Sequence, residues 1–198
     1  MFKFIKENSY LIFKMMVNQL GMMMFGMVLA MATTNNDTLL LITSVFAVLF
    51  YMALLYMMTW EYGSKERVRV DHGRMKYMPL KGLYMSLCAN AVNILLAVTL
   101  LIGYFNIADK AALRNAAVEV VKPEWAFNMY MISRMFAMFI QAMYMGLISL
   151  YAPYNPVAFI LILLPALLAS AAGYYLGVKD IRLLGFLGIK QKPNNTDK

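Results

Sequence analysis

Five long apolar stretches separated by polar segments divide this chain. They cover residues 9–31, 39–60, 83–104, 126–150 and 156–178. Because about 20 apolar residues in a helix cross the hydrocarbon core of a bilayer, each stretch predicts one transmembrane helix. We therefore expect an all-α integral membrane protein, with residues 1–198 forming a single membrane domain. Its core would be one bundle of five transmembrane helices.

The polar segment 61–81 determines the predicted orientation. It carries six basic residues against Glu61, Glu66 and Asp71, a net charge of +3. Short basic loops stay in the cytoplasm, so we expect this loop and the N-terminus to be cytoplasmic. Six basic side chains are predicted to contact the membrane surface or a docking partner: Lys65, Arg67, Arg69, Arg74, Lys76 and Lys81.

The same segment contains a pattern typical of a short hairpin. Polar and apolar residues alternate in 67–70 and again in 74–77, and Asp71, His72 and Gly73 between them are turn residues. This predicts a small β-hairpin with Gly73 in the left-handed conformation.

Residues 106–125 form the second long polar segment, and their charges balance. Asn106 and Asp109 resemble a helix-capping pair, Ala-rich sequence follows, and Pro123 ends the pattern. We expect a short amphipathic helix on the external surface.

The C-terminal tail conflicts with a count of five crossings. Five crossings from a cytoplasmic N-terminus place the tail outside, yet residues 179–198 carry a net charge of +3. Either the 61–81 loop dominates the orientation, or one apolar stretch is re-entrant, with the segment around Pro165 as the candidate. The side of the C-terminus stays open.

The first stretch has a second interpretation as a signal peptide. Ala30, Met31 and Ala32 match the small-residue form of a cleavage site. Asn18 and Gln19 would interrupt the hydrophobic region of such a peptide, which favours a retained helix.

Composition agrees with the membrane class, since 62% of the residues are hydrophobic and 14% are charged. Soluble domains carry nearer a quarter charged residues. The net charge of +8 is spread over loops and tails, which indicates lipid contact and orientation, not nucleic-acid binding. We expect the protein in the plasma membrane of a bacterium. Cys88 is the single cysteine, so no internal disulfide can form.

The sequence predicts no enzyme, cofactor or metal site. It contains no glycine-rich phosphate loop, nucleophile elbow or zinc-binding helix motif. The 20 methionines could suggest copper(I) binding, but they are spread over most of the spans and form no cluster with His or Cys at a pore mouth. Methionine as a filler of apolar gaps explains them with fewer assumptions.

Polar residues inside the stretches are the candidates for ligand binding. Arg134 is the one charge deep in a predicted span, and such a charge is costly in hydrocarbon. The amide side chains could instead bond to one another and tie the bundle together. The predicted ligand-binding set is Arg134, Gln141, Asn90, Asn93, Asn18 and Gln19.

A stripe of small residues on the last stretch predicts close helix packing. Ala166, Ser170, Gly173 and Gly177 share one helix face.

Two functions fit these features. The first is an interaction, regulatory or assembly subunit of a membrane complex, with a partner membrane protein or a second copy of the chain. The second is the membrane component of a transporter that binds a small polar or anionic solute. Both place the protein in the lipid bilayer, and neither involves nucleic acid.

Overall fold

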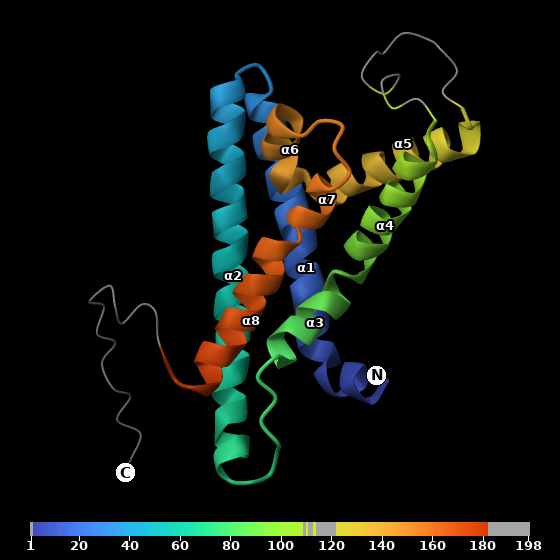
Figure 1. Ribbon diagram of the computed structural model, residues 1–198. Helices are drawn as coiled ribbons and strands as arrows, with labels where there is room; N and C mark the ends of the chain where they lie inside the picture. Colours follow the sequence, from blue (N-terminus) through green and yellow to red (C-terminus); the bar gives the residue numbers. More distant parts are fainter. Residues whose placement is uncertain (1, 109, 111–112, 114–121, 182–198) are drawn as a thin grey trace.

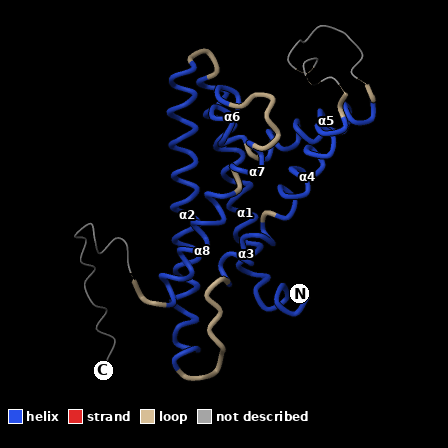
Figure 2. The backbone as a smooth tube through the Cα atoms, viewed as in Figure 1, coloured by secondary structure: helices blue, strands red, loops and turns tan. Residues whose placement is uncertain are grey.

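The structure is a computed structural model that describes residues 2–108, 110, 113 and 122–181. These residues form helices joined by loops and turns, without a strand (Figure 1, Figure 2). The elements in chain order are α1 (Phe2–Thr33), α2 (Asp37–Asp71), α3 (Lys81–Ala89), α4 (Ala91–Asn106), α5 (Glu124–Ile140), the 3₁₀ turn η1 (Ala142–Tyr144), α6 (Met145–Tyr151), α7 (Ala158–Leu161) and α8 (Leu164–Val178).

The predicted all-helical class is confirmed, and so is the presence of helices long and apolar enough to span a membrane. Within the described residues, three helical segments are long and apolar enough to cross a bilayer, and up to five if each of two bent pairs counts as one span. The number of crossings therefore stays a prediction.

The helices α1 and α2 form a long antiparallel hairpin, which contains the predicted spans 9–31 and 39–60. Asn36 ends the turn between them, and its side chain accepts a hydrogen bond of 3.1 Å from the backbone N–H of Leu39. Asparagine is a favoured N-cap because its side chain satisfies one of the free N–H groups of the first turn.

The hairpin predicted for residues 67–77 is wrong, because α2 continues as a helix to Asp71. Thr59, Gly63 and Glu66 are buried at helical spacing on this extension. Burial of one helix face therefore outweighs the alternating pattern. Gly73 does adopt the expected left-handed conformation, with φ of 67°.

The predicted span 83–104 is a bent pair. The axes of α3 and α4 differ by 65° at Asn90. The side-chain nitrogen Nδ2 of Asn90 donates to the carbonyl of Ser86 at 3.0 Å, one turn earlier. Asparagine side chains compete in this way with the backbone ladder of a helix.

The predicted span 126–150 is bent more sharply, by 91°, between α5 and the η1–α6 segment. Beyond the bend, α6 lies beside the first turns of α2, where the backbone N–H of Gly146 donates to Ser44 Oγ at 2.9 Å. The start of α5 packs on the end of α4 around Gly103. Both ends of this bent segment thus lie at the end of the molecule that holds the α1–α2 turn (Figure 1).

The last predicted span, 156–178, consists of α7 and α8 with a break at Ile162 and Leu163. Pro165 lies in the first turn of α8, where its missing N–H costs no helical hydrogen bond. The segment around Pro165, the candidate for a re-entrant turn, instead begins a helix, and Ala158–Val178 is long and apolar enough to cross a bilayer. From there α8 runs alongside α2 (Figure 1).

The small-residue face of α8 forms the most extensive helix contact in the described structure, against α2. Ala166, Ser170, Gly173 and Gly177 are all buried, as predicted. A Cβ atom added to Gly173 would lie 2.6 Å from the carbonyl oxygen of Tyr56, so the two backbones touch. This contact fixes α8 on α2.

The molecule has two ends and two parts. We call the end formed by the N-terminal turns of α1, the last turns of α2, loop 72–80, the start of α3 and the end of α8 the basic end. The α1–α2 turn marks the opposite end. We call the pair α4–α5 the arm, because it projects away from α2 and α8 (Figure 1, Figure 2).

The predicted amphipathic helix within 106–125 falls largely outside the described residues. In the described part of that range, Asn106 is the last residue of α4, and the backbone N–H of Ala108 donates to the carbonyl of Lys122 at 3.1 Å.

The contact between α8 and α2 can be tested with two glycine substitutions. Gly173→Leu forces a side chain into backbone and should lower the free energy of unfolding by about 1–3 kcal/mol or more. Gly21→Leu is the matched control, since an added Cβ there has no atom within 4 Å. Thermal unfolding in detergent measures both. Equal melting temperatures for the two variants would contradict the packing described.

Candidate functional site

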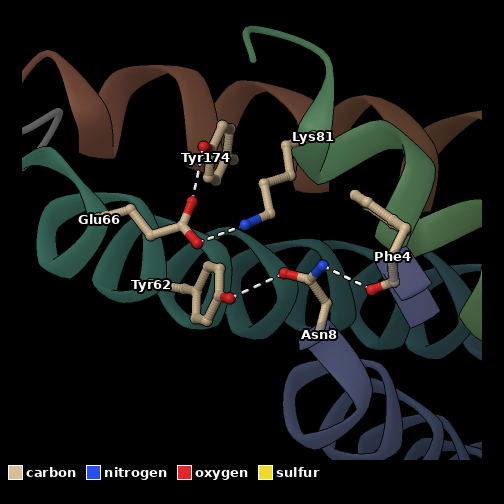
Figure 3. Close-up of polar contacts among 6 residues, drawn as sticks. All are labelled: Phe4, Asn8, Tyr62, Glu66, Lys81 and Tyr174. Carbon is tan, nitrogen blue, oxygen red and sulfur yellow. Dashed lines mark hydrogen bonds and ion pairs between the residues drawn. The ribbon is translucent and has the colours of Figure 1, made fainter. Parts of the chain in front are cut away.

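A cluster of buried polar side chains joins three helices at the basic end (Figure 3). Glu66 of α2 is 3% exposed, and Lys81, the first residue of α3, is 4% exposed. Lys81 Nζ forms an ion pair and hydrogen bond with Glu66 Oε1. The hydroxyl of Tyr174 on α8 donates to the other carboxylate oxygen, Oε2, at 2.8 Å. Each oxygen of Glu66 therefore has its own donor.

A second pair of hydrogen bonds connects α1 to the same cluster (Figure 3). The hydroxyl of Tyr62 on α2 donates to Asn8 Oδ1 at 2.8 Å, and Asn8 Nδ2 donates to the carbonyl of Phe4 at 2.7 Å. The Tyr62 ring also faces the Lys81 ammonium, with Nζ 5.3 Å from the ring centroid. Through Asn8, α1 becomes the fourth helix of the cluster, and four of these five polar contacts run between helices.

Glycines beside the cluster allow the helices to approach. A Cβ on Gly63 of α2 would lie 2.5 Å from the carbonyl oxygen of Tyr174, and one on Gly82 of α3 would lie 2.5 Å from that of Ser170. Larger residues at either position would separate the helices and pull Lys81 and Tyr174 away from Glu66. The cluster therefore depends on its polar side chains and also on the two glycines, whose lack of a side chain lets the helices approach.

The position of the cluster explains how charges can be buried in so apolar a chain. Glu66 lies six residues beyond Trp60, which is about 9 Å along a helix that rises 1.5 Å per residue. The cluster is thus beyond the apolar part of α2, at the level expected for lipid headgroups. Its charges are compensated within the protein, and the paired side chains connect α2 to α3 and α8.

The cluster changes the predicted role of the basic segment. Lys81 is buried and paired, so it is not part of a docking surface. Lys65 pairs with Glu61 at 2.6 Å. Arg67 lies 2.6 Å from Asp180 and 3.4 Å from Asp71. Within the described residues, the predicted docking cations that are exposed and make no ion pair are Arg69, Arg74 and Lys76.

Sequence reasoning missed Glu66 and Tyr174. A signal was present: Leu55, Thr59, Gly63 and Glu66 continue the buried face of α2 past the end of its apolar stretch. The period of that face, not its polarity, indicates that the helix goes on and that Glu66 points inward.

The six predicted ligand-binding residues lie on α1, on the α3–α4 pair and on α5 with its C-terminal bend. Gln19 and Gln141 are buried on α1 and at the α5–η1 bend. In the described structure, the one hydrogen bond among the six side chains runs from Asn93 Nδ2 to Asn90 Oδ1, at 3.0 Å. Buried atoms without a hydrogen-bond partner remain on three of them: Asn18 Nδ2, Asn93 Oδ1 and Arg134 Nε.

Arg134 lies on the arm, and its main neighbour is an aromatic ring. Its guanidinium carbon is 5.2 Å from the centroid of Tyr154, in the loop between α6 and α7. The hydroxyl of Tyr130, one turn earlier on α5, donates to the backbone carbonyl of Tyr154 at 3.4 Å. These contacts hold the arm to the 152–157 loop, but they leave Arg134 Nε without a partner.

A recess of about 430 Å³ opens beside this loop, at the opposite end from the cluster. Tyr104 and Lys110 form one wall, and Tyr151, Tyr154 and Asn155 form another. None of the six predicted ligand-binding residues lines it.

The buried ion pair can be tested by a double-mutant cycle. Lys81→Met leaves the Glu66 charge buried and should cost about 3–5 kcal/mol of unfolding free energy. Adding Glu66→Gln removes that charge and should recover part of the loss, giving a coupling energy of about 1–3 kcal/mol. Chemical denaturation in detergent measures the cycle. The exposed pair Lys65–Glu61 on the same helix is the control and should show little coupling. Equal coupling in both pairs would contradict the buried cluster.

Comparison with known proteins gives no assignment for this arrangement. No family model matches the chain, and neither a curated protein nor a solved structure matches it. A function has to be argued from the geometry of the described residues.

Proposed function

We propose that the chain crosses the membrane four times and that residues 124–151 enter and leave on one side. The 91° bend between α5 and α6 supports this topology, as does the position of both ends of the segment beside the α1–α2 turn. The basic tail and the basic 61–81 segment then share one side. This arrangement removes the charge conflict that five crossings create.

Single-cysteine variants in a Cys88→Ser background test this topology. We expect an impermeant thiol reagent to label Asn35→Cys and Asn155→Cys in intact cells, but not His72→Cys. All three positions are exposed in loops or turns. Labelling of Asn155→Cys only after the cells are opened, together with His72→Cys, would instead support five crossings.

We infer that the protein is an interaction or assembly subunit of a membrane complex, and that its arm contacts the partner. Within the arm, α4 and α5 pack closely on each other: Ser133 Oγ donates to Thr99 Oγ1 at 2.9 Å, and Gly103 lies against Tyr130. Outward-facing positions on the arm carry large apolar side chains, including Phe105 at 65% and Met135 at 62% exposed.

The unpartnered Arg134 Nε is the observation that carries this proposal. An arginine in hydrocarbon costs a few kcal/mol, and the contact with Tyr154 returns only part of that cost. A carboxylate, amide or carbonyl on a partner helix would complete its hydrogen bonding. Lipid chains can cover the apolar residues around it, but they offer no acceptor to a guanidinium.

The alternative is a solute-binding component of a transporter. The recess lined by Lys110 and tyrosines favours it, because a cation and hydroxyl groups suit a small polar or anionic solute. Against it, the intramembrane amides and Arg134 do not line that recess.

Arg134→Met separates a partner contact from a structural role, because it keeps most of the volume and removes the charge. A photoreactive residue at Phe136 on the arm should cross-link one defined membrane protein in cells. With Arg134→Met this product should be lost, while the melting temperature of the purified protein stays equal or rises. The same photoreactive residue at Phe46 on α2 is the control and should give no such product. If Arg134→Met gives the same cross-link and the same stability, the proposal fails.

A further inference from the structure

A long apolar groove runs between the first turns of α1 and the α3–α4 pair. Its volume is about 820 Å³. Phe4 and Ile12 line it on α1, and Cys88, Ile94 and Val98 line it on α3 and α4. None of its lining residues carries a charge. An apolar groove of this size favours an apolar occupant.

The bend at Asn90 creates this groove. The first helix packs on α3, and Phe4 meets Tyr84 edge to face with ring centroids 6.3 Å apart. Beyond Asn90 the 65° change of direction carries α4 away from α1 (Figure 1). The groove therefore lies between α1 and a helix pair that turns away from it at Asn90.

Exposed cations that make no ion pair in the described structure lie on loop 72–80, the loop that leads into the groove. All three carboxylates of the 61–81 segment are engaged in ion pairs: Glu61 with Lys65, Glu66 with Lys81, and Asp71 with Arg67. Arg74 and Lys76 are exposed and make no ion pair within the described residues, and Met78, two positions after Lys76, lines the groove. On α1, the exposed Lys6 and Glu7 offset each other.

We propose that the groove holds an acyl chain of an anionic phospholipid whose headgroup contacts Arg74 and Lys76. The apolar lining suits the chain, and the cations attract the phosphate. A helix from a second copy in the same orientation fits less well. It would bring its own Arg74 and Lys76 to the same membrane level, and like charges repel.

Native mass spectrometry of the detergent-solubilised full chain tests this proposal, with dioleoyl phosphatidylglycerol and dioleoyl phosphatidylcholine as probes. The parent chain should retain phosphatidylglycerol about 25-fold better than phosphatidylcholine, because two cations contribute. Arg74→Gln with Lys76→Gln should remove this preference, at about fivefold for each cation. Equal retention of the two lipids by the parent chain overturns the proposal.

A groove-filling variant tests the position of the lipid. Ala91→Phe adds a ring inside the groove and should reduce retention of both lipids, whereas Ala53→Phe on the exposed face of α2 should not. If Ala91→Phe does not fold, Val98→Phe on the same wall replaces it. Unchanged retention in the folded groove variant overturns the proposal. So does efficient cross-linking of Cys88 to Cys88 between copies in vesicles, because it would place a second chain in the groove.

Discussion

The direct backbone contact between α2 and α8 is the constraint on which the basic end depends. Gly173 and Gly177 on one helix and Gly63 on the other let the two backbones touch over several turns. Van der Waals contact of this kind is the main attraction available to helices in lipid, where apolar side chains gain nothing by leaving the solvent. With α8 held at this depth, Tyr174 reaches Glu66, Asp180 reaches Arg67, and the carbonyl of Ile181 accepts a hydrogen bond from Trp60.

The molecule consists of a body, whose helices pack extensively on one another, and the arm, whose helices make few contacts with that body. The body consists of α1, α2, α3 and α8, and Asn8, Glu66, Lys81 and Tyr174 in its buried cluster are all paired. The arm leaves polar atoms without partners at Asn93 and Arg134. In a protein that must satisfy polar groups inside a membrane, such atoms are expected where another molecule approaches.

The sequence predicts the body much better than the arm. Length and apolar character are enough to place α1, α2 and α8, and the spacing of Gly173 and Gly177 correctly indicates a packed face. The bends at Asn90 and Gln141 do not follow from apolar length, because a straight helix and a bent pair bury similar residues. Local competition by a side chain, as at Asn90, and tertiary contacts, as at Gly146, decide between them.

The buried cluster was hidden for a different reason. Composition counts charges, but it does not say which of them neutralise each other. Glu66 and Lys81 are 15 residues apart across a helix end and a loop, and both appear in a segment whose net charge suggested a solvated surface. Only the helical spacing of Thr59, Gly63 and Glu66 indicates that the Glu66 side chain points into the protein.

The two interruptions that bound the arm also have a mechanical consequence. At Asn90 and again at Gln141 the regular helix gives way to a turn, and between these points α4 and α5 are packed on each other. The arm is therefore joined to the body through two interrupted helices, and the hydrogen bond from Tyr130 to the carbonyl of Tyr154 holds it beside the 152–157 loop. Because α4 and α5 are packed on each other, a change of angle at either interruption would shift both helices together. The ion pair of Lys81 with Glu66 lies on the body side of Asn90, so the cluster at the basic end does not depend on the angle of the arm.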